Sequence, residues 1–159
     1  MTASAQTSSV EKKLAELGIT LPSPKPPVAN YVPVVRTGNL LFVSGQVSAD
    51  ADGKIATGKL GAGVSIEAGQ AAAKLCAINI LAQVKAAIGD LDKVVRIVKL
   101  VGFVNATGDF ADQPKVVNGC SDFFVEVLGD KGRHARSAVG VSGLPFDCSV
   151  EVEAIVEIA

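Results

Sequence analysis

The sequence has few aromatic residues, a single histidine and only three cysteines; aromatic side chains make up 4% of its 159 residues, and tryptophan is absent. Cys76, Cys120 and Cys148 are odd in number, lie far apart and lack CxxC spacing. This pattern excludes a disulfide framework and a zinc site built on paired cysteines, and it favours a reducing compartment. Their apolar neighbours indicate small buried side chains rather than reactive thiols.

An excess of charge of either sign is also absent, since 15 Lys and Arg residues are balanced by 16 Asp and Glu residues. Nucleic-acid binding draws much of its affinity from counterions that basic side chains displace from phosphates. We therefore expect no nucleic-acid partner.

Targeting signals and long hydrophobic runs are missing as well. Residues 1–10 are rich in Ser, Thr and Ala but contain no basic segment followed by an apolar core, so they do not predict a secretory signal. No uninterrupted apolar run has the length of a bilayer-spanning helix. The sequence predicts a cytoplasmic protein with no membrane partner.

The chain is rich in apolar residues: 48% are hydrophobic and only 19% are charged. A chain of this length can bury one core, and the apolar surplus predicts contact with another subunit. The helical spacing of Val10, Leu14 and Leu17, followed by four prolines between residues 22 and 27, predicts a short helix and an ordered arm over residues 1–27. Residues 28–159 form the expected main domain.

Periodicity in the main domain predicts alternating strands and helices. Strands are expected at residues 31–35, 40–43, 94–105, 137–141 and 150–158, and helices at residues 65–88 and 113–128. This order predicts an α+β fold in which two helices pack on one face of a single sheet. In the last strand, Glu151, Glu153, Ile155 and Glu157 alternate with small apolar residues, so the second face suits a wet surface, a subunit interface or a site wall.

Two separated segments resemble the signatures of one family. The first, residues 29–46, reads ANYVPVVRTGNLLFVSGQ, and the second combines HARSAV at residues 134–139, GLP at 143–145 and VEVEA at 150–154. Both resemble the YjgF/RidA family, and the resemblance covers nearly all of residues 31–154. The chain departs from the family pattern in having Ala29-Asn30 in place of Gly-Pro, and Ala138 in place of a cysteine.

The resemblance implies a chorismate-mutase-like fold, a homotrimer and a ligand pocket in each cleft between subunits. It also implies hydrolysis of reactive 2-imino and enamine acids to 2-oxo acids and ammonia, with no metal and no cofactor. By position in the signatures, Arg136 is the expected carboxylate anchor, Glu151 the group that handles the attacking water, and Tyr31 and Ser44 are pocket residues. A planar guanidinium can bind both oxygens of a carboxylate, and a placed glutamate can accept a proton from water.

Plainer interpretations of the same residues stay open. Arg136 could be a structural ion-pair partner, Glu151 one more interface carboxylate, and Tyr31 a residue of the hairpin core. His134, the only histidine, is expected to be an exposed loop residue rather than an acid or base. The alternative functions are a non-catalytic trimer that binds small carboxylates as a metabolite sensor, and an endoribonuclease. The even charge balance and the lack of paired catalytic histidines disfavour the latter.

Overall fold

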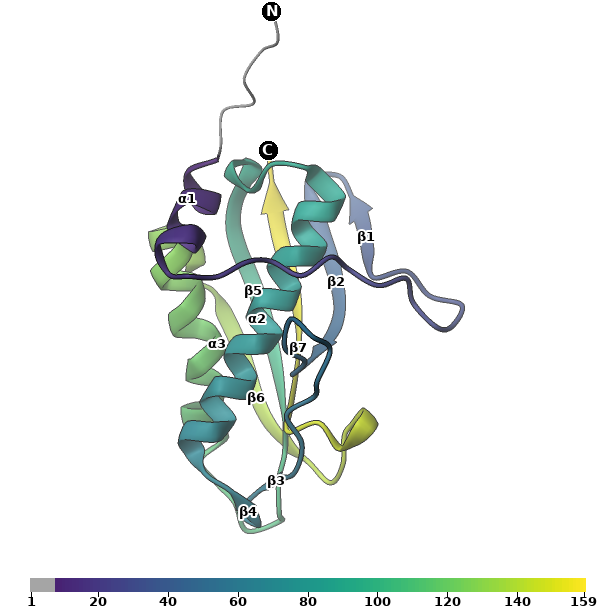
Figure 1. Ribbon diagram of the computed structural model, residues 1–159, viewed down its shortest axis with the longest axis vertical. Helices are drawn as coiled ribbons and strands as arrows, with labels where there is room; N and C mark the ends of the chain where they lie inside the picture. The colour runs from purple at the N-terminus through teal and green to yellow at the C-terminus, as the bar shows by residue number, and fades with distance from the viewer. Residues whose placement is uncertain (1–7) are drawn as a thin grey trace, which may run out of the picture.

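The computed structural model describes residues 8–159 and contains one five-stranded sheet with its helices on one side (Figure 1). The strand order is β1-β2-β7-β5-β6, and β6 alone runs parallel to its neighbour. The strands are β1 Val34–Thr37, β2 Leu40–Val47, β5 Val94–Asn105, β6 Ala135–Val141 and β7 Val150–Ile158. The predicted α+β fold is thus confirmed, with a mixed sheet.

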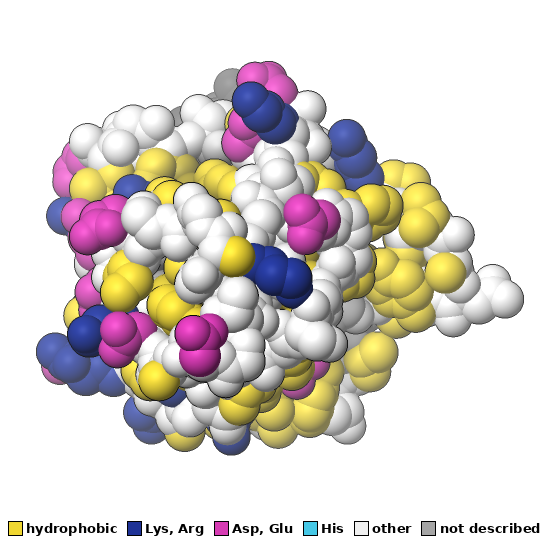
Figure 2. All heavy atoms as spheres, turned by 90° about the horizontal axis from the view of Figure 1, so that it is seen from below, with side chains coloured by type: hydrophobic (Ala, Val, Ile, Leu, Met, Phe, Trp, Pro, Cys, Tyr) yellow, Lys and Arg dark blue, Asp and Glu magenta, His cyan; other side chains and the backbone are white. Residues whose placement is uncertain are grey.

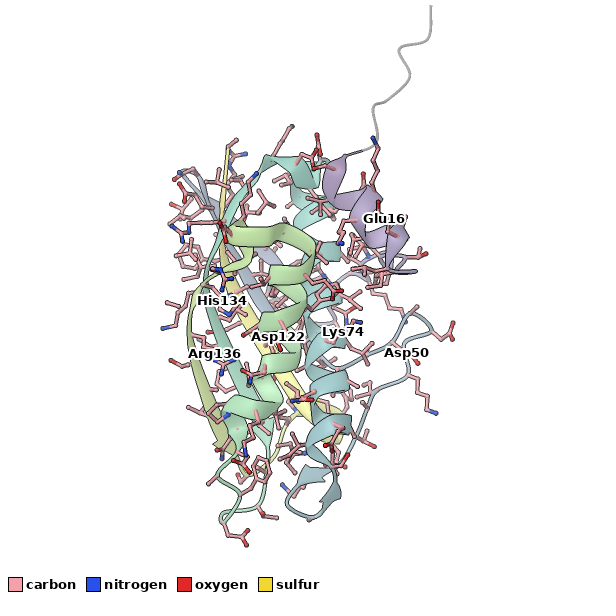
Figure 3. The ribbon with its side chains drawn as sticks, turned by 90° about the vertical axis from the view of Figure 1, so that its left-hand side faces the viewer. Glu16, Asp50, Lys74, Asp122, His134 and Arg136 are labelled. Atoms are coloured by element: carbon pink, nitrogen blue, oxygen red, sulfur yellow. The ribbon has the colours of Figure 1, made fainter. Side chains whose placement is uncertain are left out.

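Two long helices cover one face of this sheet, which we call the helix face. They are α2, Ile66–Ile88, and α3, Gln113–Leu128. Ser65 caps α2 by accepting a hydrogen bond from the Ala68 backbone N–H, which explains why the helix begins where the sequence predicts. The opposite face, which we call the outer face, is covered by no element among residues 8–159 (Figure 3).

The core lies between the helices and the helix face of the sheet. The inward residues of β7, from Val150 to Ile158, are at most 3% exposed and pack against buried residues of α2 and α3. By length and composition α2 would suffice to span a membrane, but half of its apolar window is buried inside the domain. Its apolar side chains therefore have partners within the fold, as a core helix requires.

Glycines let the two helices pack closely. At Gly119 of α3, a Cβ atom would lie 2.7 Å from the Gln70 Cα atom of α2. At Gly102 of β5, it would lie 2.7 Å from a methyl group of Val117. Since real Cβ atoms essentially never approach other heavy atoms this closely, the position of α3 on the sheet depends on these two residues lacking a side chain.

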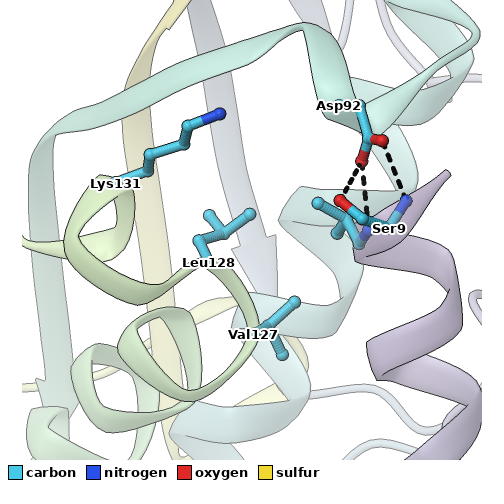
Figure 4. Close-up of a pocket in the computed structure, with 6 residues that line it drawn as sticks. Ser9, Asp92, Val127, Leu128 and Lys131 are labelled. Carbon is cyan, nitrogen blue, oxygen red and sulfur yellow. Dashed lines mark hydrogen bonds between the residues drawn. The ribbon is translucent and has the colours of Figure 1, made fainter.

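A short N-terminal helix, α1 (Ser9–Glu16), joins the same core through Val10 and Leu14. Asp92, in the turn before β5, accepts hydrogen bonds of 2.8 and 3.0 Å from the backbone N–H groups of Ser9 and Val10 (Figure 4). These bonds lower the pKa of Asp92, because they stabilise its charged form. The proline arm then runs across α2 to reach β1 (Figure 1).

Local boundaries differ from the prediction at the first hairpin. Strand β1 begins at Val34 rather than residue 31, since Pro33 lacks the N–H that a ladder needs. Strand β2 continues to Val47, four residues past its expected end at residue 43, through a register shift between Val43 and Gln46. A two-stranded piece, β3 Lys59–Leu60 with β4 Gly63–Val64, lies in the glycine-rich stretch.

Residues 28–33 project from the domain beside β1 (Figure 1). Their side chains are mainly hydrophobic, as the protruding segment in Figure 2 shows. Val28, Tyr31 and Val32 are each more than half exposed. Exposed hydrophobics continue onto the outer face at Val35 and Phe42. Such a contiguous apolar surface is typical of a protein contact.

Candidate functional site

The guanidinium of Arg136 is held against α3 by three hydrogen bonds. Its Nη1 donates to the Asn118 amide oxygen at 2.9 Å and to the Ser121 hydroxyl at 3.0 Å, while Nη2 donates to the Pro114 carbonyl at 3.1 Å. Residues 114, 118 and 121 are spaced by four and three, so they share one face of the helix. Arg136 lies on β6, directly beside buried Leu100 of β5, and points to the helix face.

The charge of Arg136 has no counter-charge in residues 8–159. All three acceptors are neutral, and no carboxylate of this part of the chain lies within 4.0 Å of it. The Nε–H and one Nη2–H donor likewise find no acceptor there. The geometry offers no structural ion pair for this arginine, and it leaves two donors and a full positive charge for something else.

His134 is not simply exposed, so that expectation is wrong. The ring is half-buried, with Nδ1 2.6 Å from the Gly132 carbonyl and Nε2 2.9 Å from the Ser121 hydroxyl. Burial, and the positive charge of Arg136 to a lesser extent, lower its pKa. Figure 3 shows His134, just before β6, and Arg136, on β6, next to α3.

Glu151 lies in different surroundings, on the outer face of β7. Its neighbours Val150 and Val152 are fully buried on the helix face, so its own side chain points the other way. No hydrogen-bond donor of residues 8–159 reaches its carboxylate. Partial burial, and then repulsion from Glu153, raise its pKa. The carboxylate lies over Gly45, where a Cβ atom would be 3.0 Å from Cδ of Glu151.

Ser44 lies near Glu151 rather than near Arg136, because it adjoins Gly45, over which the Glu151 carboxylate lies. The Ser44 hydroxyl donates to the Val32 carbonyl at 3.0 Å, which ties the segment bearing Tyr31 to β2. Ser44 also lines a hollow of about 350 Å³ on the outer face, whose other walls include Phe42, Lys99 and Glu153. The Tyr31 side chain is 53% exposed, so it does not close the hairpin core.

Within one chain, the predicted site residues therefore fall into two groups. Ser44 and Glu151 belong to the outer face around β2 and β7, and Tyr31 lies in the projecting segment that Ser44 ties to β2. Arg136 belongs instead to the helix face of the edge strand β6. Strand β5 lies between β7, which carries Glu151, and β6, which carries Arg136. Within one chain, Arg136 and Glu151 thus point to opposite faces of the sheet.

Asn118, Ser121 and the Pro114 carbonyl are site residues that sequence reasoning missed. A signal existed, because polar Asn118 and Ser121 interrupt a helix whose neighbouring positions Val117 and Cys120 are buried. Hydroxyl and amide groups on a half-buried helix face need partners. Among residues 8–159, no cluster of three His, Cys, Asp or Glu side chains is arranged to hold a metal ion.

Comparison with known proteins identifies the family to which the domain belongs. Residues 11–158 match the model of a family described as YjgF/chorismate mutase-like, putative endoribonuclease. The chain belongs to this family. It is 49% identical to protein TCP17 of Trypanosoma cruzi over 94% of both chains, and 35% identical to the 2-iminobutanoate/2-iminopropanoate deaminase of Escherichia coli over 80% of this chain and 87% of that one.

Solved structures of the family share the fold. A crystal structure of a protein of unknown function from Agrobacterium tumefaciens is 54% identical and superposes with a TM-score of 0.88. The match covers 95% of this chain and 94% of that one. The family assignment and the chorismate-mutase-like fold expected from the two sequence signatures are thus confirmed.

Proposed function

We propose that this protein hydrolyses reactive 2-imino and enamine acids to 2-oxo acids and ammonia, as an imine deaminase without metal or cofactor. The observation that carries the proposal is the state of Arg136, whose guanidinium is fixed by neutral acceptors and keeps two free donors and an uncompensated charge. Such a group suits a carboxylate, which accepts two charge-assisted hydrogen bonds from it. The deaminase name of the E. coli relative agrees with this choice.

Glu151 supplies the proton chemistry. Its carboxylate accepts a proton from a water molecule while the water oxygen attacks the imine carbon and the C=N electron pair moves to nitrogen. The proton then passes to that nitrogen, which gives a carbinolamine. Glu151 next accepts the proton of the new hydroxyl and delivers it to the nitrogen, so that the C–N bond breaks, ammonia leaves and the carbonyl forms. A raised pKa makes the carboxylate a better base near neutral pH, so partial burial favours this step.

The complete site is formed by two copies in a homotrimer. The Arg136 edge of one copy meets the outer face of the next, which carries Glu151, Ser44 and Tyr31. This head-to-tail contact closes into a ring after three copies, and it covers the exposed apolar residues Val35 and Phe42. The same contact explains why an uncovered sheet face carries both apolar and carboxylate side chains.

A second candidate is a non-catalytic trimer that binds a small carboxylate with Arg136 and does not need Glu151. The observation that favours it is the pair of free donors on Arg136, which explains the binding of a carboxylate but requires no catalytic step. Endoribonuclease activity is disfavoured, since the net charge of the chain is −1 and both nitrogens of its only histidine are engaged by Gly132 and Ser121.

Mixed assemblies of Arg136→Ala and Glu151→Gln chains test both the chemistry and the composite site. Each variant alone should be nearly inactive in releasing ammonia from an enzymatically generated imine. If each variant carries a different affinity tag, mixed trimers can be purified through both tags. In any mixed ring of three, one of the three contacts joins an intact Arg136 to an intact Glu151. Mixed trimers should therefore recover about a third of the wild-type rate.

Absence of recovery in mixed trimers would place both residues in a site within one chain and contradict the composite arrangement. Wild-type protein that binds pyruvate but releases no ammonia would favour the non-catalytic candidate. A monomer in light scattering at micromolar concentration would exclude the homotrimer.

A further inference from the structure

Three side chains form a continuous hydrogen-bonded relay beside the proposed carboxylate anchor. It runs from the Gly132 carbonyl through the His134 ring and the Ser121 hydroxyl to the Arg136 guanidinium, with distances of 2.6, 2.9 and 3.0 Å. Arg136 lies on β6 and His134 directly precedes that strand, while Ser121 reaches both from α3. The relay therefore joins the sheet edge to the helix.

The direction of every hydrogen bond in the relay follows from donor and acceptor chemistry. A carbonyl oxygen only accepts, so Nδ1 of His134 carries the proton that binds Gly132. In the neutral ring Nε2 then accepts, and the Ser121 hydroxyl must donate to it. The Ser121 oxygen is left as an acceptor, which is what the Arg136 Nη1–H requires.

We propose that His134 is a positioning residue that acts through Ser121 to hold the Arg136 guanidinium in its carboxylate-binding orientation. This inference rests on the proposed role of Arg136, which it deepens. A serine hydroxyl by itself rotates freely, and it can point its proton toward Arg136. The His134 ring fixes the hydroxyl proton away from the guanidinium, so that the side of Nη1 facing α3 is always satisfied.

The surroundings of His134 make this arrangement sensitive to protonation. From α3 the ring meets Ser121 and the edge of Phe124, and from the preceding turn it meets the Gly132 carbonyl. The charged groups near it are Arg136, two residues further along the chain on β6, and the exposed pair of Asp130 and Arg133, which bind each other at 3.2 Å. A second proton on the ring would turn Nε2 into a donor and place a positive charge beside the guanidinium.

Calorimetry with pyruvate tests the relay without relying on turnover. His134→Ala and Ser121→Ala should each weaken binding about three- to tenfold, the scale of one neutral hydrogen bond. The double variant should bind no more weakly than the weaker single one, because both changes break the same relay. His134→Gln, whose amide oxygen can accept from Ser121, should restore most of the affinity.

The pH profile separates positioning from a merely structural role. Because burial and Arg136 lower the pKa of His134, the wild type should keep its pyruvate affinity down to acidic pH and lose it as the ring protonates. His134→Gln should lack this loss. If His134→Ala does not fold, the comparison of wild type with His134→Gln still decides the matter.

Two failures can be told apart. Pyruvate binding that is unchanged in Arg136→Ala would overturn the proposed anchor itself. Binding that is lost in Arg136→Ala but unchanged in His134→Ala and Ser121→Ala would overturn the relay alone. Additive losses in the double variant, or identical pH profiles for wild type and His134→Gln, would also contradict it.

Discussion

The two faces of the sheet hold charged groups of opposite sign in opposite ways. On the helix face, Arg136 makes three hydrogen bonds to fixed neutral groups and keeps its charge uncompensated. On the outer face, Glu151 has no hydrogen-bond donor from residues 8–159, lies half-buried and has a raised pKa. The first arrangement suits a group that must hold still, and the second suits a group that must exchange a proton.

The largest expected effect comes from removing the proton acceptor. Glu151→Gln keeps the shape of the side chain, so turnover should fall by about 10²- to 10⁴-fold while pyruvate binding survives. Steady-state kinetics and calorimetry on the same preparation check both halves of the prediction. Unchanged turnover would assign Glu151 to the subunit contact.

Arg136 should respond to substitution with a loss of binding as well as of rate. Arg136→Ala removes charge-assisted hydrogen bonds, which predicts about ten- to a hundredfold weaker pyruvate binding. Arg136→Lys should not restore function, because a point charge cannot replace a planar two-pronged donor or bind three acceptors on α3. As a control for folding and assembly, both variants must give the same circular dichroism spectrum and the same particle size in light scattering as the wild type. Wild-type affinity in the alanine variant would remove the main support for the deaminase proposal.

Gly119 faces rigid backbone atoms, whereas Gly45 faces a side chain that can move. Gly119→Ala places a methyl group against the backbone of Gln70, so unfolding in urea should show a loss of about 1–3 kcal/mol. Gly45→Ala meets only the carboxylate end of Glu151, which can rotate away. It should therefore change stability little and reduce turnover instead. The opposite outcome, a stable Gly119→Ala and an unstable Gly45→Ala, would contradict this assignment.

The smallest expected effect concerns the pKa of Glu151. Glu153→Gln removes the repulsion that contributes to the raised pKa, so the acid limb of the rate profile should move to lower pH. A carboxyl group with a raised folded-state pKa costs stability as the pH rises through its unfolded value. Glu151→Gln should therefore gain stability over wild type at neutral pH and lose that gain in acid. An unshifted limb would show that Glu153 does not act on Glu151.

Part of this comparison could be predicted from the sequence. The strict alternation in residues 150–158 places Glu151 opposite the core, because side chains of a strand alternate between its faces. For β6 no such inference was available, since the run from Ala135 to Val141 contains small residues on both sides of Arg136. Its face depends on the parallel pairing with β5, which is a contact distant in sequence.

The sequence by itself determined the long helices, the central strand, the inward face of the last strand and the family. Helical and strand periodicities are local, and both signatures lie in continuous segments. Only the tertiary structure decided that Arg136 and Glu151 point to opposite faces, and that His134, Ser121 and Asn118 meet around the guanidinium. These arrangements follow from the strand order and from the close packing that Gly119 and Gly102 allow, and neither leaves a periodic trace along the chain.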